Sequence, residues 1–431
     1  MNISIIGTGY VGLVTGVGLA EKGHRVICVD TDGSKVDSIN RGVPPIFEKD
    51  LEGMLERLVK EEKLEATMDT ANAVKNSQVT FICVGTPSSE DGSIDTSYVE
   101  RASQDIAEAL MEKDEYHVVC VKSTVVPGTT EGLVLPIMEV AGLEMGKDMG
   151  LGMNPEFLRE GVALDDFMNP DRIVIGGADD RSKSVLREIY QDFESPVVVT
   201  DIKTAEMIKY VSNALLATKI SFANEMSRIC EKIGADVYGV MDGVGLDSRI
   251  ERKFLDAGVG FGGSCFPKDV MALIHFCRWQ GVNPRILEAV IKVNEHQPIH
   301  AVNMLEDMLG RLSGKRIAIL GLAFKADTDD VRESRAIPMA QELLRRGARV
   351  VGYDPMAGKN FSGEVSNVEL AGSVEEALTG SHGCLIQTDW EEFRSLGEKD
   401  FMVMSTPVVL DGRRVLNPEG FDKVRYRTIG R

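Results

Sequence analysis

Short apolar runs alternate with helical patterns over the first part of the chain. Asn2–Ile6 and Arg25–Val29 have the composition of buried parallel strands, and a helix pattern lies between them. Further strand-like runs cover Val79–Gly85 and His117–Thr124. Because strands that alternate with helices form parallel sheets, the pattern predicts a doubly wound Rossmann-like domain over residues 1–200.

The middle of the chain is helical in pattern. Thr204–Ile233 carries apolar residues at helical spacing, over a length that can span a domain and connect two others. Helix patterns also cover Pro267–Trp279 and the stretch from Pro284 to about Leu312, with little strand signal between them. We therefore expect an α-helical middle domain over residues 201–312, with the long helix as connector.

The alternation of strand and helix resumes after Gly314. A strand pattern at Arg316–Leu320 is followed by a helix at Pro338–Arg346 and a strand that ends at Asp354. This copy lacks a full glycine fingerprint, so it need not hold a dinucleotide, and the nucleotide part of a substrate would suit it. The predicted fold class is α/β, with a second Rossmann-like domain over residues 313–431.

The first strand runs directly into the glycine sequence GTGYVG. Gly7, Gly9 and Gly12 then open a helix, and the next strand ends in Asp30. In a dinucleotide fingerprint the glycines permit a tight turn, close approach of the pyrophosphate and helix packing, and the acidic residue accepts the ribose hydroxyls. Asp30 would repel a 2′-phosphate, which favours NAD over NADP, although Lys35 could partly offset this repulsion.

A single thiol stands inside the glycine-rich run Gly258–Asp269. Pro267 is typical of a helix start, which puts Cys265 just before a helix N-terminus and near Lys268. The positive end of the helix dipole lowers a thiol pKa and makes a thiolate nucleophile available. The remaining cysteines fit apolar patterns and are expected to be buried hydrophobic residues: Cys28, Cys83, Cys120, Cys230, Cys277 and Cys384.

Two residue pairs have helical spacing. Glu156 and Glu160 are four apart, and on a helical turn these like charges would share a face, so a cation or a reaction is expected to use them. Solvated surface glutamates are the alternative. Lys209 and Asn213 lie one turn apart on the long helix. A lysine on such a helix usually faces solvent.

Several polar residues follow strand ends, where ligands of doubly wound sheets bind. Thr86 and Thr124 follow two strands of the first domain, and Lys325 and Arg332 follow the first strand of the last domain. For the threonines the alternative is an ordinary turn residue, and for the basic residues an ordinary surface charge.

The bulk composition excludes several classes of protein. The chain has 431 residues and a net charge of −19, which disfavours nucleic acid and anionic membranes as partners. No apolar run approaches the roughly 20 residues that a bilayer needs, and the first residues form a strand pattern, so we expect a cytoplasmic protein. The 7 cysteines form no CxxC and no Cys/His cluster, which argues against disulfides and against a metal site.

Taken together, the motifs resemble those of the UDP-glucose/GDP-mannose dehydrogenase family over essentially the whole chain. They occur in family order, as GTGYVGLVTG, VGTPSSEDGSID, KSTVVPGTT, NPEFLREG, KYVSNALLATKISFANE, GVGFGGSCFPKD, FKADTDDVRES and YDP. The resemblance is closest to members that act on UDP-glucose. It implies two Rossmann-like domains joined by the long helix, and a four-electron oxidation of the C6 alcohol of a nucleotide sugar to the carboxylate, here UDP-glucuronate, by two NAD.

The resemblance also implies catalytic roles. Cys265 would capture the C6 aldehyde as a thiohemiacetal, which a second oxidation converts to a thioester. Lys209 and Asn213 would stabilise oxyanion charge at C6, Asp269 and Thr124 would hold a water, and Glu160 would be the base for thioester hydrolysis.

Binding residues are implied in the same way. Cofactor contacts are Gly7, Gly9, Tyr10, Val11, Gly12, Asp30, Lys35, Thr86, Thr124 and Arg332. Substrate contacts are Glu156, Phe157, Leu158, Lys209, Asn213, Phe254, Leu255, Gly262, Phe324 and Lys325. Arg249 would enter the substrate site of a neighbouring subunit, which implies a homodimer. Two positions depart from the family pattern, Arg335 where proline is frequent and Arg414 where asparagine is frequent.

Alternatives remain open at the level of sequence. GDP-mannose and UDP-N-acetylmannosamine would undergo the same chemistry. A two-electron dehydrogenase of the 2-hydroxyacid or phosphogluconate type would need no nucleophilic thiol. A protein that binds NAD as a regulatory signal would turn over no nucleotide sugar and would have little use for Lys209, Asn213, Cys265 and Asp269 together.

Overall fold

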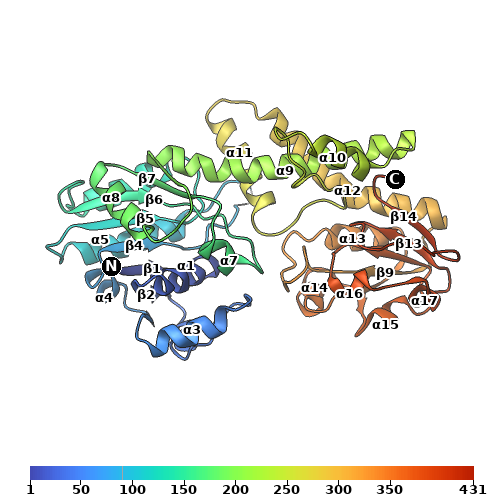
Figure 1. Cartoon of the computed structure of the whole chain (residues 1–431), viewed down its shortest axis with the longest axis horizontal. Coiled ribbons are helices and arrows are strands. Elements are labelled where there is room, and N and C mark those ends of the chain that lie inside the picture. Colours follow the sequence, from blue (N-terminus) through green and yellow to red (C-terminus); the bar gives the residue numbers. More distant parts are fainter. Residues whose placement is uncertain (90) are drawn as a thin grey trace. The chain divides into compact units, whose positions relative to one another are not determined.

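The computed structural model of the chain describes residues 1–89 and 91–431. Its contacts divide the chain into two compact units, Met1–Ser212 and Asn213–Arg431. Helix α9 (Ile202–Ile233) begins in the first unit and ends in the second, and Figure 1 draws it as one continuous helix. The long connecting helix that the sequence predicts is therefore present.

The first unit is built on an 8-stranded sheet with the order β3-β2-β1-β4-β5-β6-β7-β8. Its neighbouring strands run parallel except for β6 and β7, which are antiparallel. The strands are β1 (Asn2–Ile6), β2 (Arg25–Val29), β3 (Leu64–Thr67), β4 (Val79–Ile82), β5 (His117–Val121), β6 (Met149–Met153), β7 (Ile173–Gly177) and β8 (Val197–Thr200). The order of the first six is that of a dinucleotide-binding Rossmann sheet.

Helices cover both faces of this sheet (Figure 1). Because side chains alternate along a strand, Ile5 joins the core on the face covered by α1, α3 and α7, whereas Ile6 joins the core beneath α4 and α5. The helical elements are α1 (Tyr10–Glu21), α2 (Gly33–Asn40), α3 (Leu51–Lys60), α4 (Thr70–Lys75), α5 (Ser97–Leu110), the π-helix η1 (Thr130–Val134), α6 (Leu135–Val140), α7 (Ala163–Met168) and α8 (Asp180–Ile189). The two buried faces explain the continuous apolar strands of the sequence.

Two predicted strands end earlier than the apolar pattern suggests. The run Val79–Gly85 is a strand only to Ile82, and the run His117–Thr124 only to Val121. The carbonyl of Ile82 accepts from two successive N–H groups, those of Lys122 (2.9 Å) and Ser123 (3.0 Å). A regular ladder uses each carbonyl once, so the chain turns out of the sheet at this point.

Residues 202–309, all of which the structure describes, contain helices and no strand. After α9 come α10 (Val237–Gly245), α11 (Phe266–Trp279) and α12 (Arg285–Leu309). The predicted helices therefore exist, with ends within three residues of the sequence pattern. In residues 1–89 and 91–431 no helix combines the length and the apolar character that crossing a bilayer requires.

The second unit contains a 6-stranded parallel sheet with the order β11-β10-β9-β12-β13-β14. Its strands are β9 (Arg316–Leu320), β10 (Arg349–Tyr353), β11 (Val368–Leu370), β12 (Gly383–Ile386), β13 (Val408–Asp411) and β14 (Arg425–Thr428). Its helices are α13 (Ala336–Arg345), α14 (Gly358–Glu364), α15 (Val374–Leu378), α16 (Glu391–Arg394) and α17 (Glu398–Phe401). Helix α12 packs against α13 and β13 (Figure 1). The predicted α/β class, with two Rossmann-like sheets and a helical region between them in sequence, is confirmed.

A buried carboxylate fastens the turn that follows β9. Asp354 stands just after β10 and is 8% exposed. It accepts hydrogen bonds of 2.7–3.0 Å from the backbone N–H groups of Leu322, Ala323, Met356 and Ala357 and from the indole N–H of Trp390. One carboxylate thus ties together three loops at the carboxyl edge of the second sheet.

We expect Asp354→Asn to destabilise this unit. An amide offers one acceptor oxygen, and its NH₂ group would face N–H donors, which leaves buried donors unsatisfied at a cost of about 1–3 kcal/mol each. Urea unfolding followed by circular dichroism measures the loss. The matched control is Asp389→Asn, whose side chain is 48% exposed. Equal urea midpoints for the two variants would contradict the assignment.

Candidate active site

The glycine turn after β1 has the shape that a dinucleotide requires. Gly7 has φ +97, and a Cβ on Gly12 would lie 1.9 Å from the Gly7 carbonyl oxygen. At Gly9, in contrast, a Cβ would meet no protein atom within 4 Å. Gly9 precedes the first turn of α1 and has no side chain to cap it, so the helix N-terminus is open to an anion. These features fit the pyrophosphate of NAD.

Asp30 follows β2 on the same edge of the sheet. It accepts from the Thr8 backbone N–H (2.9 Å), from the Thr8 hydroxyl (2.5 Å) and from the Asp32 N–H (3.0 Å). Partial burial raises the pKa of Asp30, but these hydrogen bonds and the charge of Lys35 lower it by more, and the net shift is downward. The Lys35 Nζ lies 3.8 Å from the carboxylate. The acceptor predicted for the ribose is therefore ionised and held in place.

The other cofactor residues predicted in this unit stand near this turn in sequence or at strand ends. Tyr10 and Val11 are the first two residues of α1. Thr86 and Thr124 follow β4 and β5, and the Thr86 hydroxyl donates to the Thr124 carbonyl oxygen at 2.9 Å. The structure thus joins two threonines that the sequence presents as separate turn residues.

A buried ion pair forms beyond β6. Lys209 is 3% exposed, and its Nζ lies 2.8 Å from Oε1 of Glu156, which is 8% exposed. Burial raises the pKa of Glu156, but the charge and hydrogen bond of Lys209 lower it by more, so the carboxylate is ionised. The usual solvent-facing position of a helical lysine does not apply to Lys209.

The expectation that Glu156 and Glu160 share a helical face is wrong. Residues 154–159 between β6 and α7 have no regular secondary structure, and Glu160 stands in the turn that follows them. Glu156 Oε2 instead accepts the N–H of Leu158 at 2.6 Å, a local bond that competes with helix formation. Glu156 is buried and Glu160 is half-buried.

The Phe157 ring lies close to two cations. The guanidinium carbon of Arg172 is 3.6 Å from the ring centroid, and Lys209 Nζ is 5.5 Å from it. Leu158 is partly buried and packs against the core of the first unit. The segment that carries both glutamates is therefore anchored at several points.

Sequence reasoning missed a buried polar cluster beside this segment. Lys122 Nζ donates to Asn154 Oδ1 at 2.8 Å, and the Tyr190 hydroxyl donates to the same oxygen at 2.5 Å. Burial lowers the pKa of Lys122, which is 4% exposed. A lysine that directly ends the apolar run HVVCVK was the available signal.

In the second unit, the thiol of Cys265 occupies the N-cap position of α11 and is exposed. The helix begins at Phe266, with proline in its first turn as the sequence predicts. Of the six other cysteines, five are buried and Cys277 is half-buried. The prediction that Cys265 differs from the others is confirmed, and the expected burial of Cys277 is only partial because its helix α11 exposes one side.

Asp269 lies one helical turn after the thiol. It is 2% exposed and accepts from the Asn213 side-chain amide (2.6 Å) and from Lys268 Nζ (2.7 Å). Its own N–H donates to the Cys265 carbonyl oxygen at 2.8 Å. Three of the residues predicted to be catalytic, Cys265, Asn213 and Asp269, therefore come together within the second unit.

The glycine loop before the thiol packs tightly on the turn after β9. A Cβ on Gly262 would lie 2.2 Å from the Glu333 carbonyl oxygen, and one on Gly263 would lie 2.6 Å from the Phe324 ring. The Lys325 Nζ lies 5.7 Å from the centroid of the same ring. Phe324, Lys325 and Gly262, all predicted substrate residues, thus belong to one neighbourhood.

The remaining predicted residues of this unit differ in exposure. Leu255 is buried, whereas Phe254 is 36% exposed, has φ +66 and contacts the Phe266 ring. The side chains of Arg249 and Arg332 are 86% and 62% exposed. Both arginines are held by a carboxylate two residues away, Asp247 and Asp330 respectively.

Three arginines of the second unit have structural partners that the sequence did not reveal. Arg335, one of the two departures from the family pattern, donates to the Glu333 carbonyl oxygen (2.8 Å). Arg414, the other, pairs with Asp236 through two contacts of 2.7 Å. Arg413 was not predicted, and its guanidinium donates to the Gly260 carbonyl oxygen of the glycine loop at 2.8 Å.

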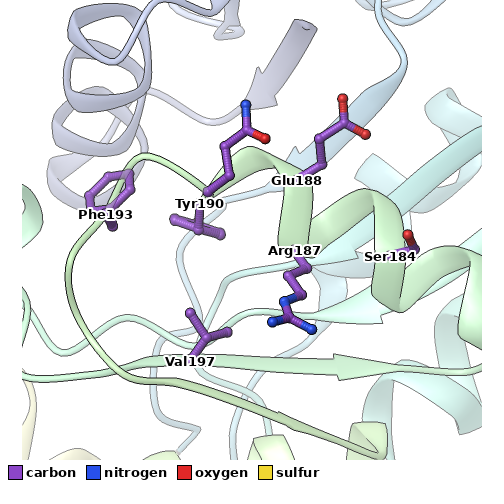
Figure 2. Close-up of a pocket in the computed structure, with 7 residues that line it drawn as sticks. Ser184, Arg187, Glu188, Tyr190, Phe193 and Val197 are labelled. Carbon is purple, nitrogen blue, oxygen red and sulfur yellow. The ribbon is translucent and has the colours of Figure 1, made fainter.

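A surface hollow of about 520 Å³ lies on α8 and the loop to β8 (Figure 2). Its lining contains none of the predicted site residues and consists of Ser184, Arg187, Glu188, Tyr190, Gln191, Phe193 and Val197. This hollow is thus separate from the residues predicted to carry chemistry.

A dinucleotide turn on a Rossmann sheet and an exposed thiol at a helix N-terminus are features of an NAD-dependent dehydrogenase, and comparison with known proteins supports this class. Residues 1–194, 203–296 and 318–418 match the NAD binding, central and UDP binding domains of one dehydrogenase family. The UDP-glucose 6-dehydrogenase AglM of Haloferax volcanii is 46% identical, over 98% of this chain and 99% of that protein. TuaD of Bacillus subtilis, also a UDP-glucose 6-dehydrogenase, is 44% identical, over 100% of this chain and 93% of that protein.

Comparison with solved structures supports the same class of protein. A UDP-glucose dehydrogenase from Pyrobaculum islandicum superimposes with a TM-score of 0.93 at 43% identity, covering 100% of this chain and 97% of that one. The chain belongs to the UDP-glucose/GDP-mannose dehydrogenase family, and its cofactor is NAD.

We expect Glu156→Gln to destabilise the fold in a pH-dependent way. The substitution leaves Lys209 buried without its partner charge, at a cost of about 3–5 kcal/mol near neutral pH. Because the folded pKa of Glu156 is lowered, its contribution is fully present above the unfolded value of about 4.3 and is lost as the pH falls through the folded value. Thermal unfolding midpoints between pH 7 and pH 3.5 measure the difference from the wild type, which should shrink below about pH 4.3.

Glu144→Gln is the matched control, since Glu144 pairs with Lys147 on the surface and its side chain is 68% exposed. This variant should unfold close to the wild type at every pH. A pH-independent loss in Glu156→Gln would refute the ion-pair account. The double variant Glu156→Gln/Lys209→Met removes both charges and should recover part of the stability.

Proposed function

We propose that this chain oxidises the C6 alcohol of UDP-glucose to the carboxylate of UDP-glucuronate, with two NAD reduced per turnover. The observation that carries the proposal is the exposed Cys265 at the N-terminus of α11, with Asp269 one turn behind it and Asn213 bonded to Asp269. Simple alcohol dehydrogenation requires no thiol, whereas oxidation to a carboxylate can proceed through a thioester. The whole-length relatives named UDP-glucose 6-dehydrogenase support UDP-glucose as the substrate.

The cofactor would be held at the carboxyl edge of the first sheet. The turn from Gly7 to Gly12 would accept the pyrophosphate, and Asp30 the adenosine ribose, with Lys35, Thr86 and Thr124 as further contacts. Arg332 is the remaining cofactor residue in the proposal. NAD supplies a hydride acceptor for each of the two oxidations.

In the first oxidation two residues of α9 would stabilise the negative charge that develops on the C6 oxygen. Lys209 supplies a positive charge and Asn213 an amide N–H toward the oxygen that becomes negative as the hydride leaves. The ion pair with Glu156 holds the ammonium group in one position and keeps it from solvent. The alcohol proton leaves through a water that Asp269 and Thr124 hold.

In the second oxidation the Cys265 thiolate adds to the C6 aldehyde and gives the alkoxide form of a thiohemiacetal. Loss of hydride from C6 of this alkoxide gives a thioester. Glu160 then draws a proton from water, the resulting hydroxide adds to the thioester carbonyl, and the carbon–sulfur bond breaks to release the carboxylate and the thiol. In sum, one alcohol, two NAD⁺ and one water give a carboxylate, two NADH and three protons.

The remaining substrate contacts fall into two groups. Glu156, Phe157 and Leu158 belong to the segment before α7, and Phe254, Leu255, Gly262, Phe324 and Lys325 belong to the loops around the thiol. We propose that residues 1–200 bind NAD, that residues 201–312 provide the thiol and the subunit contact, and that residues 313–431 bind the UDP part. The match of residues 318–418 to a UDP binding domain supports the last assignment.

Other nucleotide sugars are less well supported. The UDP-D-ManNAc dehydrogenase of Pyrococcus horikoshii superimposes well, with a TM-score of 0.89, but is only 29% identical. The GDP-mannose dehydrogenase of Pseudomonas aeruginosa is 35% identical with a TM-score of 0.58. Relatives named for UDP-glucose reach 46% identity over nearly the whole chain.

The stoichiometry of NADH tests the reaction. With limiting UDP-glucose and excess NAD, we expect two NADH per UDP-glucose and none from GDP-mannose or UDP-N-acetylmannosamine in parallel assays. Activity with only one of the other sugars would support the same reaction on a different substrate. No NADH with any of the three would refute the proposal and favour a protein that binds NAD as a signal.

Cys265→Ser is the matched variant for the covalent step. It should still oxidise the alcohol once but stall before hydrolysis, so that steady turnover is lost. Cys277→Ser is the control, because Cys277 is half-buried on the same helix and has no role in the proposal. Full turnover in Cys265→Ser would show that the reaction does not use this thiol.

We also propose that the chain works as a homodimer. Exposed apolar side chains recur every seven residues on α9, at Leu215 (59% exposed), Phe222 (50%) and Ile229 (49%). Such a stripe is typical of a helix that packs against another helix. In this proposal Arg249, which is exposed on the loop after α10, serves the substrate site of the partner.

A subunit-mixing experiment separates this role from one within the same chain. Arg249→Ala and Cys265→Ser should each be nearly inactive with UDP-glucose. A mixed dimer would contain one site with an intact thiol from the first variant and an intact arginine from the second. Mixing after mild dissociation should therefore restore activity, with sedimentation velocity to verify dimers. Mixed dimers that stay inactive would place Arg249 outside the neighbouring site.

A further inference from the structure

A buried carboxylate outside the proposed catalytic set contacts the segment that carries Glu160. Glu48 lies between α2 and α3 and is 6% exposed. Its Oε2 accepts the N–H of Gly161 at 2.9 Å, and its Oε1 accepts the N–H of Ala163 at 2.8 Å. A carboxylate buried with two backbone donors forms charge-assisted hydrogen bonds, which are stronger than neutral ones.

Glu48 caps the N-terminus of α7, which the N-cap residue of this helix leaves uncapped. Helix α7 starts at Ala163, and its N-cap residue Val162 makes no side-chain cap hydrogen bond. The orphan N–H of the first turn is therefore satisfied from a distant part of the chain. Gly161, which bonds to the same carboxylate, has φ +86 and directly follows Glu160. The backbone that sets the position of Glu160 is thus fixed by Glu48.

The same carboxylate reaches the dinucleotide turn. The hydroxyl of Tyr10, the first residue of α1, donates to Glu48 Oε2, and the Gly161 N–H lies 2.7 Å from that hydroxyl oxygen. Tyr10 directly follows Gly9, where the open space for a pyrophosphate begins. Helix α7 packs beside α1 (Figure 1). One hydrogen-bonded group therefore joins the start of α1 to the residue after Glu160.

We propose that Glu48 and Tyr10 are positioning residues that couple the dinucleotide turn to the segment carrying Glu160, so that occupation of the turn by NAD steadies this segment for hydrolysis of the thioester. The role of Glu160 in this inference rests on the proposed function. Neither Glu48 nor the Tyr10 hydroxyl touches reacting atoms in this account. They act through the backbone of Gly161 and Ala163.

Amide hydrogen exchange tests the coupling without any turnover. In the wild type, NAD should slow exchange in peptides that cover residues 154–168. In Glu48→Gln the amide has one acceptor oxygen for two N–H donors, so exchange there should be faster without NAD, and NAD should restore little protection. Tyr10→Phe keeps the ring and the backbone but removes the hydroxyl, and at saturating NAD it should lose most of the NAD-induced protection.

Kinetics and intact mass test the consequence for the reaction. A displacement of about 1 Å in a catalytic group can cost on the order of 100-fold, so we expect kcat of Glu48→Gln to fall by about 10- to 100-fold, with a smaller change in KM for NAD. Slower hydrolysis should make a covalent adduct on Cys265 accumulate during turnover, visible by mass spectrometry of the quenched protein. Tyr98→Phe is the control, because Tyr98 is 56% exposed on α5, and it should match the wild type in every readout.

The outcomes separate this inference from the proposed function. If the wild type makes two NADH per UDP-glucose but exchange over residues 154–168 is the same in wild type and variants, the coupling is overturned. If exchange depends on Glu48 and NAD as described but no nucleotide sugar is oxidised, the coupling stands and the proposed function falls. A loss of kcat without adduct on Cys265 would overturn the link to hydrolysis.

Discussion

The ion pair between Lys209 and Glu156 is the constraint on which the first half of the candidate site depends. An ammonium group that is 3% exposed must have a partner charge, because burial of an unpaired ion is costly. The pair therefore attaches an irregular segment to the long helix α9. Phe157, which lies close to two cations, and Leu158, which packs on the core, add further contacts to this segment. A segment without regular secondary structure thereby acquires a defined position.

Each sheet has an aspartate directly after its second strand, but the two aspartates have different surroundings. Asp30 after β2 receives its hydrogen bonds from Thr8 and Asp32, and it stays partly exposed at the ligand edge. Asp354 after β10 is surrounded by donors of its own unit. In the second sheet a Cβ on Gly321 would lie 2.4 Å from the Thr388 side chain, so the turn after β9 requires glycine, as Gly7 is required in the turn after β1.

Much of the fold was predictable because it follows from local patterns. Apolar runs gave the buried strands, and the spacing of apolar residues gave α9, α11 and α12. The helix start at Pro267 placed Cys265 correctly at a helix N-terminus. The end of β4 was not predictable, since the residues Cys83 to Gly85 stay apolar or small after the chain has left the sheet.

The side-chain partners in the candidate site were harder to predict because they join residues far apart in sequence. Glu156 and Glu160 have helical spacing. However, Glu156 accepts a hydrogen bond from the Leu158 N–H and pairs with Lys209, and both contacts favour an irregular backbone. The burial of Lys122 and Glu48 follows from partners that are 32 and 113 residues distant. Spacing along the chain carries no information on such contacts, whereas the residues predicted to be catalytic stood out through their motifs.

The distribution of thiols has a consequence for handling and for survival of the protein in an oxidising environment. Burial raises the pKa of Cys28 and of Cys83 to about 12, which keeps both as unreactive thiols at neutral pH. Cys265 is instead open to water at a helix N-terminus. Peroxide or an alkylating reagent will therefore reach Cys265 before the buried thiols, and mild oxidation of Cys265 to a sulfenic acid would block the proposed covalent step while the cores remain intact.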